Sequence, residues 1–223
     1  MTPWNRQTLA KLIDHAVLSP TATVADVEQA CRIGKQYSVA SVCVRPSDVT
    51  TAYNLLKSTR TCVSTVIGFP HGTTTTKAKM AEAEQAMMDG ARELDMVINI
   101  GRMLSNDTQY VQHEIQQIAQ MVHQEKCLLK VILEMCYLSA DLKQTACSIA
   151  VSAGADFLKT STGFASSGAT PEDVRLMREI APGRVGIKAS GGIRDLVQMI
   201  TLVTSGANRI GTSSTAKIMM EVK

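Results

Sequence analysis

The stretch DFLKTSTGF, residues 156–164, reads as a short apolar strand that ends in Lys159 and a run of small residues. The stretch VGIKASGG, residues 185–192, repeats this pattern around Lys188. Burying an ammonium group costs free energy, so a lysine at the inner edge of a strand needs a compensating reason. Two lysines at equivalent positions of two similar strands indicate a repeated structural unit. One reason should therefore account for the burial of both lysines.

The same unit, an apolar strand followed by a loop and an amphipathic helix, recurs along the whole chain. We expect strands at residues 11–18, 40–46, 62–69, 94–101, 128–134, 156–162, 184–190 and 208–214. Capping residues mark several helix starts, at Thr23, Ser47-Asp48, Ser139 and Thr170. Strands that alternate with helices pair in parallel, because each helical crossover covers a face of the sheet.

This pattern predicts a single α/β domain over residues 1–223, built as an eight-stranded (β/α)8 barrel, or TIM barrel. Neither a linker nor a change in composition divides the chain. A doubly wound open sheet is the alternative fold. That fold typically carries a glycine-rich GxGxxG turn after its first strand, where this chain has LSPTAT, residues 18–23.

Composition excludes several classes of protein. Hydrophobic residues make up 45% of the chain and charged residues 19%, which is typical of a globular protein. The net charge of +3, without a run of basic residues, argues against nucleic-acid and membrane partners. The chain has no long apolar run and no secretory-signal pattern. The six cysteines lack metal-ligand spacing, so we expect reduced thiols, no metal and a cytoplasmic location.

Catalytic residues of barrel enzymes lie at the C-terminal ends of the strands. Side chains alternate along a strand, so Lys159 and Lys188 should point into the barrel, while Leu158 and Ile187 meet the helices. On the fourth strand the same rule turns Asp95 inward. Strands four and six supply the same interior layer, so Asp95 and Lys159 should lie at a similar height, with Lys188 beside them.

A lysine amine attacks a carbonyl only when it is neutral, and the pKa of a free lysine is about 10.4. Partial burial and a second ammonium nearby both lower that pKa. We therefore hypothesise that Lys159 and Lys188 are a nucleophile and its activating neighbour, and that Asp95 transfers protons. In the structural alternative, one lysine forms a buried ion pair with Asp95 or Glu134 and the other reaches solvent.

Small residues follow the last two strands. Residues 190–192 read SGG, and residues 211–214 read GTSS. Barrels often bind phosphate at these two loops, where backbone N–H groups and a helix N-terminus can donate hydrogen bonds. The alternative is that these residues only form the tight turns and helix caps that any barrel needs.

Seven segments closely resemble the deoxyribose-phosphate aldolase family. They are LIDHAVL (12–18), VIGFPHGTTTTKAKMAEAE (66–84), ELDMVINIG (93–101), LKVILE (129–134), DFLKTSTGF (156–164), GIKASGGIR (186–194) and RIGTSS (209–214). The resemblance implies a class I aldolase without metal or organic cofactor, which reversibly splits 2-deoxy-D-ribose 5-phosphate into D-glyceraldehyde 3-phosphate and acetaldehyde. It also implies a homo-oligomer, expected as a dimer, in deoxynucleoside breakdown. Another Schiff-base lyase or a transaldolase-like enzyme is the alternative.

The resemblance also implies roles for single residues. Lys159 would form the Schiff base, Lys188 would perturb it and relay protons, and Asp95 would donate and accept protons. Asp14, Cys43 and Thr162 match positions that line the family's substrate pocket, and the phosphate contacts map to Gly163, Gly191, Gly192, Gly211, Ser213 and Ser214. One position departs from the family pattern: Ala16 replaces the usual threonine, which puts one contact to the sugar in question.

Overall fold

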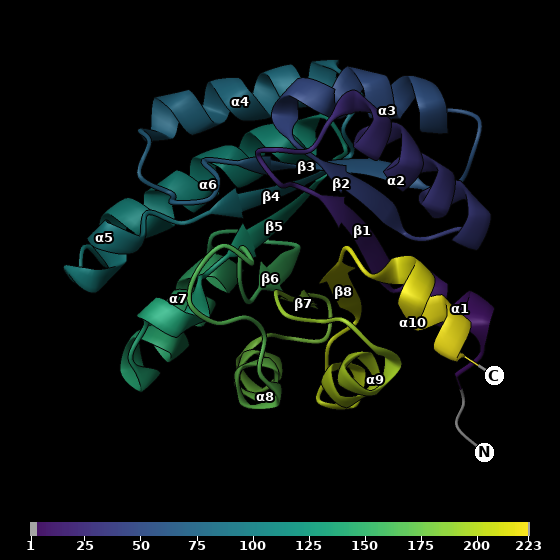
Figure 1. Ribbon diagram of the computed structural model, residues 1–223. Coiled ribbons are helices and arrows are strands. Elements are labelled where there is room, and N and C mark those ends of the chain that lie inside the picture. Colours follow the sequence, from purple (N-terminus) through teal and green to yellow (C-terminus); the bar gives the residue numbers. More distant parts are fainter. Residues whose placement is uncertain (1–3, 223) are drawn as a thin grey trace.

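The computed structural model describes residues 4–222, which form a closed barrel of parallel strands in the order β1 to β8 (Figure 1). The strands are β1 (Ile13–Val17), β2 (Ser41–Val44), β3 (Cys62–Ile67), β4 (Glu93–Val97), β5 (Leu128–Ile132), β6 (Phe157–Lys159), β7 (Gly186–Ser190) and β8 (Arg209–Thr212). Each overlaps a predicted segment, with β4 beginning one residue earlier than predicted, so the TIM-barrel prediction is confirmed.

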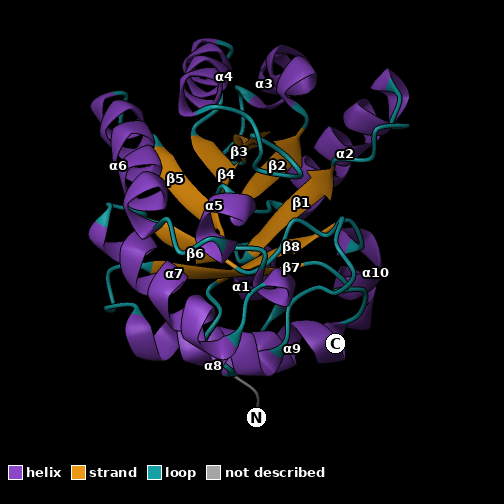
Figure 2. Cartoon of the chain, turned by 90° about the vertical axis from the view of Figure 1, so that its left-hand side faces the viewer, coloured by secondary structure: helices purple, strands orange, loops and turns teal. Residues whose placement is uncertain are grey.

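Most of the helices surround the barrel on its outside, whereas the short helix α5 is drawn in front of the middle of the barrel in Figure 2. The helices are α1 (Arg6–Ala10), α2 (Val24–Tyr37), α3 (Val49–Leu56), α4 (Thr76–Met88), α5 (Ile100–Leu104), α6 (Thr108–Gln124), α7 (Ala140–Ser152), α8 (Pro171–Ile180), α9 (Leu196–Thr204) and α10 (Thr215–Glu221). Two 3-10 turns, η1 (Pro46–Asp48) and η2 (Met135–Tyr137), follow β2 and β5. In the described part of the chain, no helix has the length and apolar character that a membrane crossing requires.

Local sequence explains where several helices begin. The side chains of Thr23, Ser139 and Thr170 each accept a hydrogen bond from a first-turn N–H group of α2, α7 and α8. These three predicted starts are confirmed. The start of α3 differs: Asp48 precedes the helix as predicted, but its side chain makes no capping bond, and the turn η1 leads into the helix instead.

The two faces of each strand carry different residues. Along β4, Leu94 and Met96 are fully buried in the hydrophobic layer under the helices. The alternate residues Glu93 and Asp95 are equally buried, but they face the barrel interior, where they meet cations from other strands. Strand pairing sets Asp95 opposite Lys130, and it therefore decides which charges meet inside the barrel.

Candidate functional site

A cavity of about 570 Å³ opens at the C-terminal ends of the strands. Of the predicted site residues, the cavity is lined by Cys43, Lys159, Thr162, Gly163, Lys188, Gly191, Gly192, Gly211 and Ser213. Ala16, the position that departs from the family pattern, also lines it. Asp14 and Asp95 are fully buried and do not line the cavity, and neither does Ser214, which follows Ser213 in the chain.

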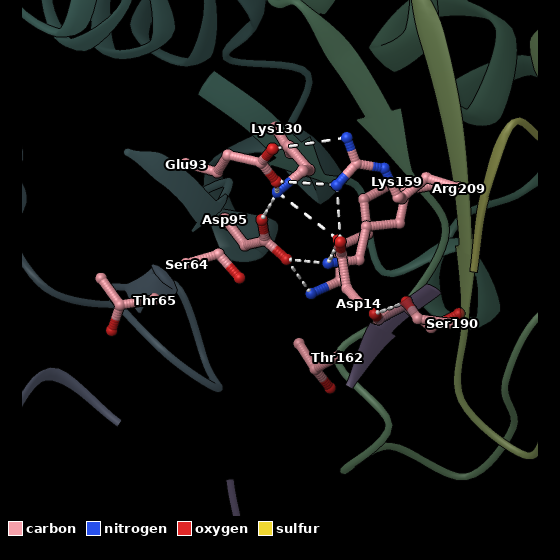
Figure 3. A network of polar contacts seen from close by, with 12 residues as sticks. Asp14, Ser64, Thr65, Glu93, Asp95, Lys130, Lys159, Thr162, Ser190 and Arg209 are labelled. Atoms are coloured by element: carbon pink, nitrogen blue, oxygen red, sulfur yellow. Dashed lines mark hydrogen bonds and ion pairs between the residues drawn. The ribbon is translucent and has the colours of Figure 1, made fainter. Parts of the chain in front are cut away.

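Asp95 holds both predicted lysines. Its Oδ2 accepts hydrogen bonds from Lys159 Nζ at 2.7 Å and from Lys188 Nζ at 2.6 Å (Figure 3). Lys159 and Lys188 are direct neighbours in the pairing of β6 with β7. The three side chains that sequence reasoning placed together therefore do meet. The structural alternative is right in that an ion pair forms, but both lysines share it and both also border the cavity.

A second group of charges lies deeper in the barrel, and sequence reasoning missed it. Lys130 Nζ lies 2.9 Å from Asp95 Oδ1 and 2.7 Å from Glu93 Oε2. Arg209 binds Asp14 at 2.6 Å and Glu93 at 2.9 Å, and its guanidinium lies over the ring of Phe157. The alternation rule that turned Asp95 inward also turns Lys130 inward. Strand alternation could therefore have predicted the inward position of Lys130, which lies below the C-terminal end of its strand.

The lysines differ in how many carboxylates they contact within residues 4–222. Lys159 contacts Asp95, Lys188 contacts Asp95 and Asp14, and Lys130 contacts both of these and Glu93. Asp14 was predicted to line the substrate pocket. The structure instead places it behind Lys188, where Ser41 also donates a hydrogen bond to it.

This difference separates the lysines in their proton affinity. Burial lowers the pKa of Lys159 and, aided by the charge of Lys188, outweighs the opposite effect of Asp95. Burial also disfavours the charged forms of Lys188 and Lys130, but the carboxylates around them raise the pKa of each above its ordinary value. Lys159 is thus the lysine of this network that most easily becomes a neutral amine.

The carboxylates are held ionised. Burial alone would raise the pKa of Asp95, but Lys130, Lys159 and Lys188 together keep that pKa well below its usual range. The pKa of Asp14 is lowered in the same way, against burial, by Lys188, Lys130 and Arg209. Asp95 therefore acts on the cavity through the two lysines that it holds, since it has no surface there itself.

Glu134 fixes the loop that follows β6. It adopts a left-handed backbone conformation (φ 51°) at the end of β5, and it is almost completely buried. Its carboxylate accepts hydrogen bonds from the backbone N–H of Thr162, at 3.2 Å, and from the Thr162 hydroxyl. Glu134 therefore anchors the cavity wall at Thr162, rather than pairing with a lysine.

The glycines of the last two strands bring backbone close to backbone. Gly191 has a φ of 87°, and a Cβ there would lie 2.9 Å from the Cα of Gly168. A Cβ at Gly211 would meet side chains, at 2.9 Å from Cβ of Ser190 and 3.2 Å from Cε of Lys188. Only glycine fits both positions without displacing a neighbour. Gly191 and Gly211 both line the cavity, and Gly191 lies close to Gly163 of the loop that follows β6.

Cys43 lines the cavity as an uncharged thiol. Burial raises the pKa of this thiol, and the nearby charge of Asp95 adds to the effect.

No group of three His, Cys, Asp or Glu residues within residues 4–222 is arranged to bind a metal ion. The cavity thus combines one amine of lowered proton affinity, one charged lysine and a glycine-rich wall. Such an arrangement can form an imine with a carbonyl compound that also carries an anion.

A model of the DeoC/LacD family of aldolases matches residues 8–219. Proteins named deoxyribose-phosphate aldolase from Clostridium perfringens strain 13 and from Thermococcus kodakarensis are each 46% identical to the chain, over 96% of it and over 95% and 97% of their own lengths. The solved deoxyribose phosphate aldolase of Aeropyrum pernix, described as a unique tetrameric structure, is 33% identical with a TM-score of 0.90, over 96% of this chain and 91% of its own. The chain belongs to the DeoC/LacD family of aldolases.

Proposed function

We propose that this chain is a class I aldolase that reversibly cleaves 2-deoxy-D-ribose 5-phosphate into D-glyceraldehyde 3-phosphate and acetaldehyde. One observation carries the proposal: an amine of lowered proton affinity, Lys159, shares a cavity with the glycine-rich loops that follow β7 and β8. The curated relatives named deoxyribose-phosphate aldolase support this choice of substrate.

The cavity suits a short chain with a carbonyl at one end and a phosphate at the other. Lys159 receives C1, and the phosphate lies against Gly191, Gly192, Gly211 and Ser213, which line the same cavity. Binding the phosphate far from the reacting bond contributes orientation rather than chemistry. Ser214, which the family resemblance also assigns to the phosphate, lies outside the cavity lining, and its backbone N–H donates a hydrogen bond to Thr212 Oγ1.

The reaction begins when the neutral amine of Lys159 attacks C1 of the open-chain sugar phosphate. Loss of water gives a protonated imine, which draws electrons from the C2–C3 bond. That bond breaks as the C3 hydroxyl loses its proton, and D-glyceraldehyde 3-phosphate leaves. The enamine that remains on Lys159 takes up a proton at carbon, and hydrolysis of the imine releases acetaldehyde and the free amine.

Lys188 and Asp95 transfer protons to and from the substrate in this proposal. Lys188 borders the cavity and stays charged, so its ammonium can hydrogen-bond the oxygen that is lost as water and the C3 oxygen. Asp95 contacts both amines but has no surface in the cavity, so it exchanges protons with the substrate through Lys188 or a bound water. The three side chains form one connected path.

Trapping the imine tests the proposal. The protein is incubated with 2-deoxyribose 5-phosphate, reduced with borohydride and digested, and the modified peptide is identified by mass spectrometry. We expect the adduct on Lys159, none in Lys159→Ala, and an unchanged adduct in Lys57→Ala, which removes an exposed lysine on α3's end. An adduct on Lys188 would reverse the two roles. A folded protein without any adduct, or products other than acetaldehyde and D-glyceraldehyde 3-phosphate, would rule out this substrate.

We also propose that the protein works as a homo-oligomer, with a dimer as the smallest assembly, in the cytoplasmic breakdown of deoxynucleosides. The tetrameric relative from Aeropyrum pernix supports an assembly of more than one chain. Light scattering coupled to size-exclusion chromatography measures the mass directly. A mass of one chain, 24.0 kDa, at micromolar concentration would refute the assembly.

A further inference from the structure

His15 lies next to Asp14 on β1, but its side chain faces the helices instead of the barrel interior. Its Nδ1 lies 2.8 Å from the hydroxyl Oγ1 of Thr215, the first residue of α10. Both side chains are buried, with exposed fractions of 4% for His15 and 0% for Thr215. The imidazole therefore touches no substrate, and it connects β1 with the start of α10.

Thr215 ends the loop that carries Ser213, a residue of the cavity wall. The other end of this loop is Thr212, which lies opposite His15 in the pairing of β1 with β8. Both ends of the segment 212–215 are thus fixed by one residue of β1. The backbone of His15 sets the position of the strand, and its ring sets the position of the helix.

The same segment is bonded to the other glycine loop. The hydroxyl of Thr212 donates a hydrogen bond to the carbonyl oxygen of Ile193 at 2.7 Å and accepts one from the N–H of Ser214 at 2.9 Å. Ile193 directly follows Gly192, which lines the cavity. The loops after β7 and β8 therefore form one connected wall, and the contact between His15 and Thr215 fixes its far end.

We propose that His15 is a positioning residue for the anion end of the cavity, because its ring holds α10 where the segment 212–215 can receive a phosphate group. The proposal rests on the phosphate-binding part of the proposed function. A displaced backbone N–H or hydroxyl loses most of its hydrogen bond, since these bonds weaken steeply with distance and angle. A small movement at Ser213 is therefore enough to weaken phosphate binding.

The environment of His15 supports this role. Burial lowers the pKa of His15 to about 4, so the ring is neutral at physiological pH. A neutral ring can hold Thr215 by a hydrogen bond, but it adds no charge that would attract a phosphate directly. An effect of His15 on phosphate affinity must then pass through the position of the loop.

Two variants remove this contact from opposite sides. His15→Phe removes the ring nitrogen, and Thr215→Val removes the hydroxyl while keeping its shape. His15→Asn is the conservative variant, because its amide can occupy the place of Nδ1. Thr61→Val is the matched control: it removes a buried hydroxyl that bonds Val39 at the other end of the barrel. Thermal unfolding first establishes that each variant is folded.

Three quantities are then measured for each protein. The first two are the dissociation constant of inorganic phosphate and KM for 2-deoxyribose 5-phosphate. The third is the exchange rate of acetaldehyde methyl protons with deuterated water, which reports enamine formation on Lys159 and needs no phosphate. We expect His15→Phe and Thr215→Val each to raise the dissociation constant of phosphate and the KM for 2-deoxyribose 5-phosphate roughly tenfold. A tenfold change corresponds to the loss of one hydrogen bond to a charged group. Acetaldehyde exchange should change less than twofold.

The combined variant should be no worse than either single one, because both remove the same contact. His15→Asn should recover most of the loss, and Thr61→Val should bind phosphate like the wild type. Unchanged phosphate constants in the folded variants would overturn the inference. So would a fall in acetaldehyde exchange at constant phosphate affinity, since His15 would then act through its neighbour Asp14. If the wild type binds phosphate but does not cleave the sugar, the proposed substrate fails while the phosphate measurement still decides on His15.

Discussion

Replacing Lys130 by methionine tests how the barrel interior controls the charge of Lys159. The buried network brings together four cations, Lys130, Lys159, Lys188 and Arg209, and three carboxylates, Asp14, Glu93 and Asp95. The network becomes balanced when one cation loses its proton. Among residues 4–222, Lys159 is the cation of this set with a single carboxylate contact, so Lys159 is the cation that should lose its proton.

Lys130→Met removes one cation and reverses this balance. Three cations then face three carboxylates when Lys159 is protonated, so the ammonium form of Lys159 is favoured. The pKa of Lys159 therefore rises, and less neutral amine is present at any pH below it. The acidic limb of kcat/KM for sugar cleavage should move to higher pH.

The geometry gives the size of this effect. Lys130 and Lys159 bind the two oxygens of Asp95 at 2.9 and 2.7 Å, which holds their ammonium groups close to each other. Two unit charges about 6–8 Å apart interact by about 2–3 kcal/mol at an effective dielectric constant of about 20. Each 1.4 kcal/mol is a factor of ten, so the neutral fraction on the acidic limb should fall roughly 30- to 100-fold.

The assay is the pH profile of kcat/KM, measured together with thermal unfolding. Lys130→Met should also lower the free energy of unfolding by about 3–5 kcal/mol, because it leaves buried carboxylates underpaired. The double variant Lys130→Met/Glu93→Gln restores an excess of one cation and should move the acidic limb back towards lower pH. If the limb stays in place in folded Lys130→Met, or if the double variant fails to move it back, charge balance does not set the state of Lys159.

Three further predictions concern other parts of the site. Gly211→Ala should lower kcat about 10- to 100-fold, because the added Cβ would lie 2.9 Å from Cβ of Ser190 and 3.2 Å from Cε of Lys188 and would displace both; steady-state kinetics measure it. Glu134→Gln should raise KM several-fold, since an amide offers Thr162 a weaker acceptor than a carboxylate, and an unchanged KM would contradict this. The pKa of His15 is lowered from 6.5 to about 4, so the folded state binds fewer protons than the unfolded one in that window. Stability should therefore fall by about 3 kcal/mol between pH 6.5 and pH 4, and this loss should be absent in His15→Phe by chemical denaturation.

Much of the site follows from two simple rules, strand alternation and the position of barrel active sites. Those rules placed Lys159, Lys188 and Asp95 together, because each lies near the C-terminal end of a strand with a clear apolar pattern. They did not reveal which charges oppose one another inside the barrel. The contact between Asp95 and Lys130 depends on the register of β4 against β5, and register is fixed by closure of the whole sheet.

Asp14 and Glu134 show a second limit of the sequence. Family resemblance placed Asp14 in the substrate pocket. In the structure Asp14 pairs with Gly211 of β8, which lines the cavity, but the Asp14 side chain is fully buried and contacts Lys188 instead of lining the cavity. Glu134 was a candidate partner for a lysine. Its left-handed backbone turns the carboxylate towards Thr162 instead, and no periodicity in the sequence signals such a local conformation.

The two lysines of the proposed reaction, Lys159 and Lys188, differ little in their immediate surroundings. Both are buried, both lie on short strands at the same height, and both bind the same oxygen of Asp95. Burial disfavours the ammonium form in each case. What separates them is Asp14, which contacts Lys188 and keeps it charged, while Lys159 has Asp95 alone within the described chain. In the proposed reaction, Asp14 therefore decides which lysine is the nucleophile, although it does not line the cavity.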